Sequence, residues 1–534
     1  MRDFKKSDES NVSRRTFLSM SGIGAAGIAL ASNMTVAHAA EETAAESGAP
    51  SFLLAPEPIS DDQISETMEY DVVVIGAGTS GVPAAMAARK EGARVAVLQK
   101  VGAAVAQGGS AACFLHDKSD DTGIQEVLSE LVKENQYRTN RKLLQVWADR
   151  GEEAIMYVLN RSQEFEGDKH WHTVREGNLA STDEHPAYWY TIRYSEPPEG
   201  NAEGIGMLAK LAEEKDGVEF FYNTPAQQLV VEDGRVTGVI ALNENDQYVR
   251  FTATKGVILA TGDYQNDDEM MRYYCPDAAD LGKKQIGKTG DGHKMGLWVG
   301  AQMEPVPHTK MVHDFSAGPM FNEPFLSVDQ DGNRFCDETV DMSYKCNFVK
   351  SGPNAGYYTQ IFDANYEQQV SDWGGKPTPA DALEKYMPEV DGDKSGVAAD
   401  INTFKADSIE ELAEKLGIDP EALQTTVDAY NTLCENGCDS QFGKPAKYLQ
   451  PVTTPPFYGI HRYLRVSAMC SGLIIDEQAR VLDADGNPIP GLWAAGNVTG
   501  EFYGGVDYPL FVNGLSVGRC FTFGYIAGEN AARA

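Results

Sequence analysis

The sequence contains one short loop whose residue types and spacing suit phosphate binding. The segment GAGTSG places Gly76, Gly78 and Gly81 in the order G-x-G-x-x-G. In such a loop the first glycine permits a tight turn, the second lets a pyrophosphate approach the backbone, and the third lets helix and strand pack closely. Free amides at the start of the following helix then bind the phosphate. The motif therefore predicts a dinucleotide-binding site.

The segments on either side of the loop are the ones that such a site requires. Residues 70–75 (YDVVVI) predict a buried parallel strand, residues 82–91 predict an alanine-rich helix, and residues 94–98 predict a second strand. The position after that strand, where an acid usually accepts hydrogen bonds from a ribose, is Gln99. We expect Gln99 to anchor the nucleotide more weakly than an acid, because its amide oxygen carries no charge.

Several later segments extend the pattern. Residues 105–112 (VAQGGSAA) form a small-residue loop that would let the backbone lie against a bulky ring. Apolar alternation around Asp233-Gly234 predicts a hairpin over residues 228–242. Further segments predict strands at residues 218–222 and 256–261, a strand and loop at residues 491–497, and a helix at residues 513–531.

In this order, the segments resemble the fumarate reductase/succinate dehydrogenase flavoprotein family, in its single-chain soluble branch. The matching stretches run from about residue 70 to residue 532 and include YDVVVIGAGTSG, QGGSAA, KGVILATGDY, DQDGNRFCDE and GLSVGRCFTFGYIAGENAA. The resemblance implies non-covalent FAD and an α/β fold. A doubly wound, Rossmann-like FAD-binding domain would carry an inserted α+β capping domain.

These expectations divide the chain into five parts. We expect a signal peptide at residues 1–39, a linker at 40–67, the first part of the FAD-binding domain at 68–299, the capping domain at 300–448, and the second part of the FAD-binding domain at 449–534. The residues expected to hold FAD, from the motifs and from the resemblance, are Gly76, Ala77, Gly78, Ser80, Gly81, Gln99, Lys100, Gly108, Gly109, Ser110, Ala226, Thr261, Gly262, Asn497, Leu515 and Ser516.

The chain departs from the family where fumarate reductases bind a dicarboxylate. Their proton-donating arginine falls on Met342, their histidine falls within the segment that contains Met469, and their last clamping arginine falls on Phe511. A dicarboxylate buried without bidentate partners would cost several kcal/mol. We therefore expect a pocket for an apolar ligand and do not expect a fumarate reductase.

A second resemblance, to 3-ketosteroid dehydrogenases of the same superfamily, supplies groups that could polarise a ketone. Their C-terminal motif uses a tyrosine hydroxyl and a glycine amide, and the matching residues are Tyr508 and Gly514. A phenol with a pKa of about 10 stays protonated and can donate to a carbonyl oxygen. The resemblance leaves the proton donor unassigned among Tyr503, Tyr344 and Lys345.

The N-terminus and the charge balance indicate where the protein acts. SRRTFL at residues 13–18, an apolar stretch and AHA at residues 37–39 predict a twin-arginine (Tat) export signal, which sends proteins to the periplasm or the extracytoplasmic surface already folded. The 79 acidic and 45 basic residues give a net charge of −34, which argues against nucleic acid as a partner. The apolar stretch of the signal is too short for a transmembrane domain.

Other residues with possible chemistry receive structural interpretations. Cys434 and Cys438 could form a small disulfide or remain thiols, and no metal site is expected. We expect structural roles for His308, His313, His461 and Arg462, an Arg334–Glu338 ion pair at the junction of the cap and the flavin domain, and a helix pair over residues 409–434. No Cys-x-x-Cys-His or four-cysteine run occurs. If the enzyme is a respiratory reductase, we therefore expect its electrons to come from a separate donor, a cytochrome or a membrane-anchored redox protein.

Together these features predict an exported FAD-dependent oxidoreductase. We expect it to reduce an activated C=C of the enone, acrylate or unsaturated lactone type in a small, fairly apolar substrate, by hydride transfer from flavin N5. Two alternatives stay open from the residues alone. One is a 3-ketosteroid-type dehydrogenase that desaturates its substrate, and the other is a non-catalytic flavoprotein that transfers electrons or binds a ligand.

Overall fold

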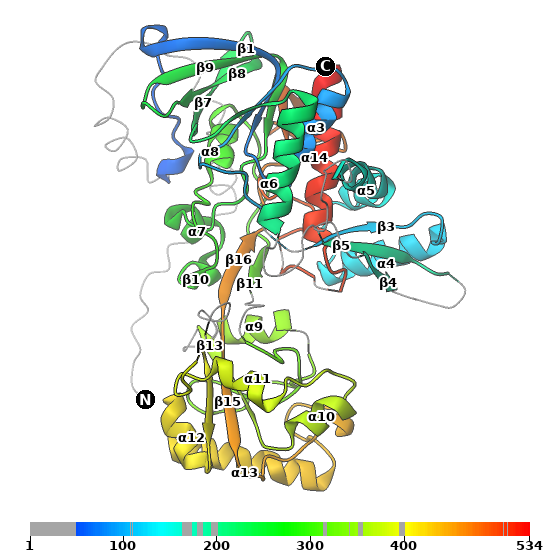
Figure 1. The fold of residues 1–534 in the computed structure, drawn as a ribbon, viewed down its shortest axis with the longest axis vertical. Coiled ribbons are helices and arrows are strands. Elements are labelled where there is room, and N and C mark those ends of the chain that lie inside the picture. The colour runs from blue at the N-terminus through cyan, green and yellow to red at the C-terminus, as the bar shows by residue number, and fades with distance from the viewer. Residues whose placement is uncertain are drawn as a thin grey trace, which may run out of the picture.

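The computed structural model describes residues 50–106, 108, 110–162, 174–178, 185–193, 201–312, 318–340, 342–350, 356–392, 394, 401–505, 507–509 and 511–534. The predicted signal peptide, Gly109 and His313 lie outside the described residues. The first and last of the described residues, 50 and 534, belong to an upper body, and a lower body is built from the middle of the sequence (Figure 1). None of the described helices is long and apolar enough to cross a membrane.

The upper body is organised around a mostly parallel sheet in the order β17-β18-β9-β1-β2-β6. Ile75, the last residue of β1, pairs with Leu98 of β2 on one side and with Leu259 of β9 on the other. Leu259 in turn pairs with Ala494 of β18. The strands are β1 (Ile64–Ile75), β2 (Val95–Leu98), β6 (Glu219–Phe221), β9 (Tyr248–Leu259), β17 (Arg480–Leu482) and β18 (Pro488–Ala494).

This order confirms the predicted doubly wound α/β class. The chain moves outward from β1 through β2 to β6 on one side and through β9 to β18 on the other. The carboxyl ends of these strands share one edge, and the direction of winding reverses between β1 and β9. Ligands of open α/β sheets bind at such a switch point.

The first strand is longer than the sequence pattern indicated. β1 begins at Ile64 and pairs with β9 along its whole length, so the predicted linker over residues 40–67 is wrong for its last four residues. The pattern failed here because Ser65, Glu66 and Thr67 are exposed, and a solvated half-strand carries little apolar signal. The hairpin at Asp233 is confirmed, with β7 (Ala226–Glu232) and β8 (Arg235–Leu242) paired antiparallel.

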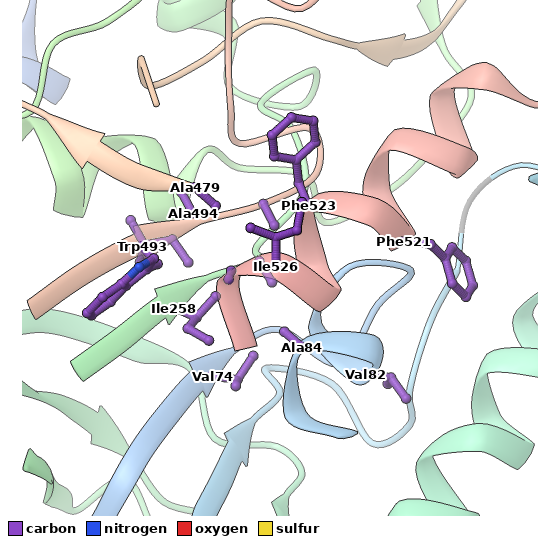
Figure 2. Packing of buried hydrophobic residues seen from close by; sticks show 14 of the residues in the cluster. Val74, Val82, Ala84, Ile258, Ala479, Trp493, Ala494, Phe521, Phe523 and Ile526 are labelled. Carbon is purple, nitrogen blue, oxygen red and sulfur yellow. The ribbon is translucent and has the colours of Figure 1, made fainter. Parts of the chain in front are cut away.

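Two helices pack closely against each other and against the sheet. Helix α3 (Gly81–Lys90) follows β1, and α14 (Leu515–Arg533) closes the chain. A Cβ on Gly524 would lie 2.3 Å from the carbonyl oxygen of Ser80, and one on Gly528 would lie 2.1 Å from that of Ala84. Figure 2 shows Phe523 and Ile526 of α14 beside the buried side chains of the strands. Glycine at these two positions therefore fixes the distance between the helices.

A side layer covers α14 on its other face. It contains a three-stranded antiparallel sheet and three helices, and Trp147 Nε1 donates to the Ala112 carbonyl at 2.9 Å to join the two parts. The elements are β3 (Ser110–Phe114), β4 (Val174–Asn178), β5 (Tyr188–Arg193), α4 (Asp121–Glu134), α5 (Arg141–Ser162) and α6 (Asn201–Leu211).

The lower body is the α+β cap. Its antiparallel sheet has the order β12-β13-β15-β14, and helices α12 (Ile409–Leu416) and α13 (Pro420–Asn436) confirm the predicted helix pair. The strands are β12 (Leu326–Val328), β13 (Tyr357–Phe362), β14 (Thr403–Ala406) and β15 (Phe457–Tyr463). Because β15 belongs to this sheet, the lower body continues past residue 448, where the sequence placed its end.

A narrow sheet of β10 (Gly282–Lys283), β16 (Arg465–Met469) and β11 (Lys310–Val312) joins the two bodies (Figure 1). Helix α9 (Met342–Lys350) lies beneath it, while α7 (Asp268–Tyr274) and α8 (Asp291–Trp298) lie above. Two shorter helices, α10 (Tyr366–Asp372) and α11 (Ala380–Leu383), complete the lower body. The chain thus returns to the upper body directly from β15 through β16.

The ion pair between Arg334 and Glu338 is present, but not at the predicted place. Arg334 binds Glu338 at 2.8 Å and Asp439 at 2.7 Å, and Lys444 lies 3.2 Å from Glu338, with all four side chains buried. Each of these residues belongs to the lower body, so the network holds the cap together internally. The expectation that it braces the junction with the flavin domain is wrong, because Asp439 on the far side of the cap provides the second carboxylate.

Replacing Gly524 with alanine should separate α14 from α3. The added methyl group meets backbone at 2.3 Å, which cannot move without shifting a helix, so we expect a loss of several kcal/mol in the free energy of unfolding. The control is Gly206→Ala in α6, where an added Cβ meets nothing within 4 Å and alanine favours the helix. Thermal unfolding of both variants tests this, and equal melting temperatures would contradict it.

Candidate active site

The glycine-rich loop lies where β1 ends, at the switch point of the sheet. Gly76 has φ of +110°, and a Cβ there would lie 2.4 Å from the carbonyl oxygen of Ala260 at the end of β9. A Cβ on Gly81 would lie 1.8 Å from the carbonyl oxygen of Gly76. Both positions therefore require glycine, and the N-terminus of α3 opens toward the shared strand edge as a phosphate site requires.

The residues after β2 face this loop but are engaged with the protein. Gln99 accepts from the Ala77 amide at 3.2 Å and donates to the Ala103 carbonyl at 2.9 Å. Its side-chain oxygen keeps a second lone pair, so Gln99 can still accept one hydrogen bond from a ribose. Lys100 donates to Thr289 at 2.9 Å and pairs with Asp291 at 2.8 Å. Lys100 thus fastens this loop to the start of α8.

The small-residue segment forms a second wall against the N-terminus of α14. The Ala112 amide donates to the Gly514 carbonyl at 2.9 Å. A Cβ on Gly108 would lie 2.6 Å from Val517 Cγ2, and one on Gly514 would lie 3.1 Å from the Ser110 carbonyl oxygen. The structure therefore brings Gly108 and Ser110 together with Gly514 and its neighbours Leu515 and Ser516, which are some 400 residues away in the sequence.

The ends of β9 and β18 supply the remaining predicted positions. Thr261 follows β9, and its buried hydroxyl oxygen has no hydrogen-bond partner among the described residues. Gly262 lies close to Lys288, since an added Cβ would be 3.1 Å from its Nζ. Asn497 follows β18 and accepts from Arg519 at 2.8 Å. Ala226 opens β7 and pairs with Ala241 on the hairpin.

These features fit a dinucleotide with two phosphates. The N-terminus of α3 lies at the strand edge, and the N-terminus of the parallel helix α14 lies further along, against the small-residue segment at residues 110–112. The unpartnered Thr261 hydroxyl offers a further polar contact at the same edge. FAD has the length and charge to span these segments, because its pyrophosphate suits the glycine loop and its ring suits the small-residue wall.

Tyr508 lies beside the N-terminus of α14, with its hydroxyl used as an acceptor. The Ser516 amide donates to Tyr508 Oη at 3.0 Å, and the side chain is buried. Burial raises the pKa of Tyr508, so the phenol stays neutral at physiological pH. Since the amide occupies the oxygen, the hydroxyl proton is available to a substrate carbonyl.

The three positions that the resemblance aligns with the fumarate-binding residues carry apolar side chains. Met469 is fully buried at the end of β16, where its amide donates to Asp263 at 3.4 Å, and Phe511 packs on the main core. Met342 is the first residue of α9. No arginine or histidine therefore comes from these three positions.

Two of the three proton-donor candidates are placed away from Tyr508. Tyr344 is exposed and donates to Glu134 of α4, while the Lys345 ammonium group donates to the Glu338 carbonyl in the lower body. Tyr503 differs, because its ring centroid lies 5.0 Å from that of Tyr508. Of these three candidates, Tyr503 is the one whose ring contacts that of Tyr508.

The predicted structural histidines have ordinary roles. His308 is held by the Tyr264 hydroxyl at 2.6 Å and the Glu304 carbonyl at 2.8 Å, and burial lowers its pKa to about 3. His461 bonds Thr359 in the lower-body sheet, where burial lowers its pKa to about 4, and Arg462 beside it donates to Gln360 at 2.6 Å. Both histidines are therefore neutral at pH 7. Cys434 and Cys438 are free thiols.

Sequence reasoning missed two buried charged residues near the site. Arg519 is 2 % exposed and is the single charged residue over residues 513–528, a signal that could have identified it. Glu304 is 4 % exposed, and one of its carboxyl oxygens has no partner among the described residues. Burial raises the pKa of Glu304 to about 7, against a smaller lowering by Arg519. No periodicity distinguished Glu304, which lies in an irregular segment.

A second set of ion pairs connects the cap to the loop that carries Tyr508. Lys350 of α9 lies 3.2 Å from Asp507 and 3.2 Å from Asp277, and Lys310 lies 2.7 Å from Asp277. Both lysine side chains are almost fully buried. Burial opposes ionisation of Asp277, but the two lysines outweigh it and lower its pKa to about 2. This cluster of ion pairs lies at the junction of the two bodies, where the sequence had predicted the Arg334–Glu338 pair.

Comparison with known proteins agrees with this geometry. A family model described as "FAD binding domain" matches residues 71–509. The chain therefore belongs to this FAD-binding family, among the relatives of the fumarate reductase/succinate dehydrogenase flavoproteins. By its relationship to the characterised members, it is an FAD-dependent oxidoreductase that acts on CH–CH groups.

Three curated relatives illustrate the range of the family. Vinyl phenol reductase of Lactiplantibacillus plantarum is 30% identical over 87% of this chain and 96% of its own length. Urocanate reductase of Eggerthella lenta is 27% identical over 87% of this chain and 75% of its own length. Digoxin reductase of Eggerthella lenta is 26% identical over 98% of this chain and 97% of its own length.

Solved structures show the same fold. An open conformation of a flavocytochrome c3 fumarate reductase matches with a TM-score of 0.65 and 25% identity, over 89% of this chain and 81% of that one. The 3-ketosteroid-Δ4-(5α)-dehydrogenase of Rhodococcus jostii matches with a TM-score of 0.65 and 24% identity, over 89% of this chain and all of that one. The predicted fumarate reductase-like fold is confirmed.

Replacing Glu304 with glutamine should remove a pH-dependent loss of stability. The native pKa of about 7 lies above the usual 4.5, so the contribution of Glu304 to stability is fully present below pH 4.5 and is lost as the pH rises from about 4.5 to about 7. The full difference corresponds to roughly 3 kcal/mol. Melting temperatures measured from pH 5 to pH 8 should fall less steeply for the variant, whereas parallel curves would contradict this expectation.

Replacing Lys350 with methionine should loosen the contact between the cap and the Tyr508 loop. Among the described residues, Lys350 is the cation paired with Asp507, so Asp507 would lose this partner while remaining largely buried, and we expect a loss of about 1–3 kcal/mol in stability. Combining Lys350→Met with Asp507→Asn should restore part of this loss. A double-mutant cycle on the free energy of unfolding measures the coupling, and a coupling near zero would show that the pair contributes nothing.

Proposed function

We propose that this protein reduces a C=C bond conjugated to a carbonyl or to another activating group in a fairly apolar organic acceptor. The observation that carries the proposal is Tyr508, a buried neutral phenol whose oxygen accepts from the Ser516 amide and whose proton is free. The apolar residues at the positions of the missing arginines and histidine support it. Vinyl phenol reductase and digoxin reductase match this chain over most of its length, and the substrates in their names support an acceptor of this kind.

In this proposal FAD, when bound without a covalent link, supplies a hydride from N5 of its reduced form. The glycine loop and the N-terminus of α14 hold the cofactor at the switch point of the sheet. Tyr508 donates a hydrogen bond to the activating oxygen of the acceptor, and the Gly514 amide, at the N-cap of α14, is proposed as a second donor. These donors stabilise the negative charge that develops on that oxygen during hydride addition.

The apolar surroundings of Tyr508 exclude water and strengthen the proposed hydrogen bond from its hydroxyl to the acceptor. Tyr503 and Tyr508 are both buried in the main core, so a bound acceptor would meet few competing water molecules. A dicarboxylate in the same place would lack the bidentate cationic partners it needs. We therefore propose that enones, vinyl phenols, acrylates and unsaturated lactones are better acceptors than fumarate.

The proposal extends to location and electron supply. The twin-arginine motif in residues 13–18 supports export, and the net charge of −34 supports docking of a basic or locally basic redox partner. We propose that this partner is a cytochrome or a membrane-anchored flavoprotein. Reduction by such a donor should slow as the ionic strength rises, because added salt screens the attraction.

Anaerobic flavin reoxidation across a panel of acceptors tests the proposed function. The reduced holoenzyme is mixed with an enone, 4-vinylphenol, an acrylate, an unsaturated lactone, urocanate and fumarate, and the return of oxidised flavin absorbance is followed. We expect fast reoxidation by at least one apolar acceptor and slow reoxidation by fumarate. Slow reoxidation by every member, or fast dye-linked oxidation of the saturated ketone alone, would contradict the proposal.

The variant Tyr508→Phe refines the test. Loss of a hydrogen bond to a developing charge should slow reoxidation by a carbonyl-activated acceptor about 10- to 100-fold. The control is Tyr525→Phe, a change of the same size in α14, where the hydroxyl bonds Glu153 at 3.1 Å on the side away from the site. An unchanged rate in Tyr508→Phe would remove the assigned role of this phenol.

A further inference from the structure

Arg519 is a buried cation without a carboxylate partner. Its side chain donates to Asn497 Oδ1 at 2.8 Å and to the Gly496 carbonyl at 3.5 Å, and its Nε has no hydrogen-bond partner among the described residues. No acid among those residues lies within ion-pair distance of it. Burying a guanidinium without an acid costs free energy of folding, and such a residue is expected where its charge stabilises a negative charge nearby. Its surroundings therefore indicate what the charge acts on.

The guanidinium lies against two aromatic rings of the segment that follows β18. Its central carbon is 5.4 Å from the ring centroid of Phe502 and 5.1 Å from that of Tyr503. Tyr503 is fully buried, and its hydroxyl has no hydrogen-bond partner among the described residues. The same ring lies edge-on to Tyr508, with 5.0 Å between the centroids and 68° between the planes. A cation, an unpartnered phenol and the proposed carbonyl donor therefore adjoin one another.

The reaction needs a second acid besides Tyr508. Hydride addition to one carbon of the alkene leaves an electron pair that must take a proton at the other carbon. The proton of Tyr508 is engaged with the activating oxygen in the proposed function, and the Ser516 amide occupies the phenol oxygen. Tyr344 and Lys345 are bonded elsewhere, and both nitrogens of His308 are engaged. Tyr503 is the adjacent hydroxyl, and the hydroxyl that interacts with it is that of Tyr508 itself, which faces the proposed site.

We propose that Tyr503 is the proton donor of the reaction and that Arg519 is the positioning residue that stabilises the tyrosinate left behind. This inference rests on the proposed function. The Tyr503 O–H bond breaks, a C–H bond forms from the electron pair of the hydride adduct, and the negative charge stays on the phenol oxygen beside the guanidinium. Solvent later returns the proton, so the net change is the addition of one hydride and one proton.

The electrostatics of the cluster agree with these roles. Burial and the neighbouring Tyr508 raise the pKa of Tyr503, so it is fully protonated before the reaction, while Arg519 acts in the opposite direction. The other titratable groups that face it are Cys470 and Cys520, both buried thiols. Arg519 is thus the single cation in this group that offsets the charge of a tyrosinate.

The experiment compares two acceptors that differ in their need for an enzymic proton. An enone adduct must be protonated at carbon, whereas a nitroalkene adduct is a nitronate, which is stable in water and can leave unprotonated. Reduced holoenzymes with Tyr503→Phe, Arg519→Gln, Arg519→Lys or the control Tyr525→Phe are mixed with each acceptor, and flavin reoxidation is followed in H2O and D2O. Flavin content and melting temperature are measured for each variant.

We expect Tyr503→Phe to slow reoxidation by the enone about 100-fold or more and to leave the nitroalkene rate within about threefold. Arg519→Gln should slow the enone in the same selective way, and Arg519→Lys should restore part of the rate. Equal slowing of both acceptors, or of neither, would overturn the assignment. If the wild-type enzyme reoxidises with neither acceptor, the proposed function itself fails, which is a different result.

A subtler replacement covers the case in which Tyr503→Phe does not bind flavin. Incorporation of 3-fluorotyrosine at residue 503 keeps the size of the ring and lowers the phenol pKa. If Tyr503 donates the proton, the alkaline limb of the enone rate should move to lower pH, while the nitroalkene profile stays unchanged. An enone profile identical to that of the wild type would overturn the assignment.

Discussion

The close approach of α14 to the rest of the upper body is the constraint on which the site depends. The first and last segments of the flavin domain meet only because glycines at positions 518, 524 and 528 leave no side chain between helix and neighbouring backbone. A Cβ on Gly518 would lie 2.1 Å from the Ala112 carbonyl oxygen, so β3 is held as tightly as α3. This packing places the N-terminus of α14 beside β3 and its middle, at Gly524, beside the N-terminus of α3. The two helices run in the same direction, so both helix dipoles have their positive ends on the same side of the sheet.

Buried charge is treated differently in the two bodies. In the cap, Arg334 is enclosed by Glu338 and Asp439, and its guanidinium donates four hydrogen bonds to these two acids, an arrangement that stabilises one packing of the lower body. In the upper body, Arg519 has two carbonyl-type acceptors and no acid. A paired network suits a part of the molecule that only needs to be rigid. A cation without a directly paired acid suits a place where negative charge arises transiently, because the nearby Glu304 carboxyl group, whose pKa is raised to about 7, offsets its field only in part.

The sequence predicted the framework well where local pattern and global fold agree. The glycine spacing, the apolar strand at residues 70–75 and the small residues of α14 each identify a feature that could not be built otherwise, and the structure has all of them. It failed where contacts are long-range. The exposed half of β1 pairs with β9, far away in the sequence, and gave no apolar signal of its own. Arg334 pairs with Glu338 as expected, but its second partner is Asp439, more than 100 residues away. Neither spacing nor composition carries such information.

The catalytic side was less predictable for a related reason. Tyr508 was found by resemblance, but nothing in the sequence shows that its oxygen meets the Ser516 amide, eight residues further on. Arg519 had a visible signal, a lone charge in an apolar helix, whose meaning depends on which rings it contacts. Tyr503 became distinguishable from Tyr344 only through burial, since one is enclosed and the other is 51% exposed.

Under the proposed function, apolar residues at the positions that the resemblance assigns to the arginines and histidine, together with the buried phenols beside α14, give the site its character. Guanidinium groups that clamp a dicarboxylate bind its charge before reaction and after it, whereas phenols bind a neutral carbonyl weakly and an oxyanion strongly. Under the proposed function, a site built from buried phenols favours acceptors that enter uncharged and acquire charge only as the hydride arrives. With Arg519 placed behind Tyr503, the positive charge of this site is directed at the proton donor and away from the substrate. A molecule without carboxylates can then be bound by its apolar surface alone, which is consistent with Met469 and Phe511 where the family carries its clamp.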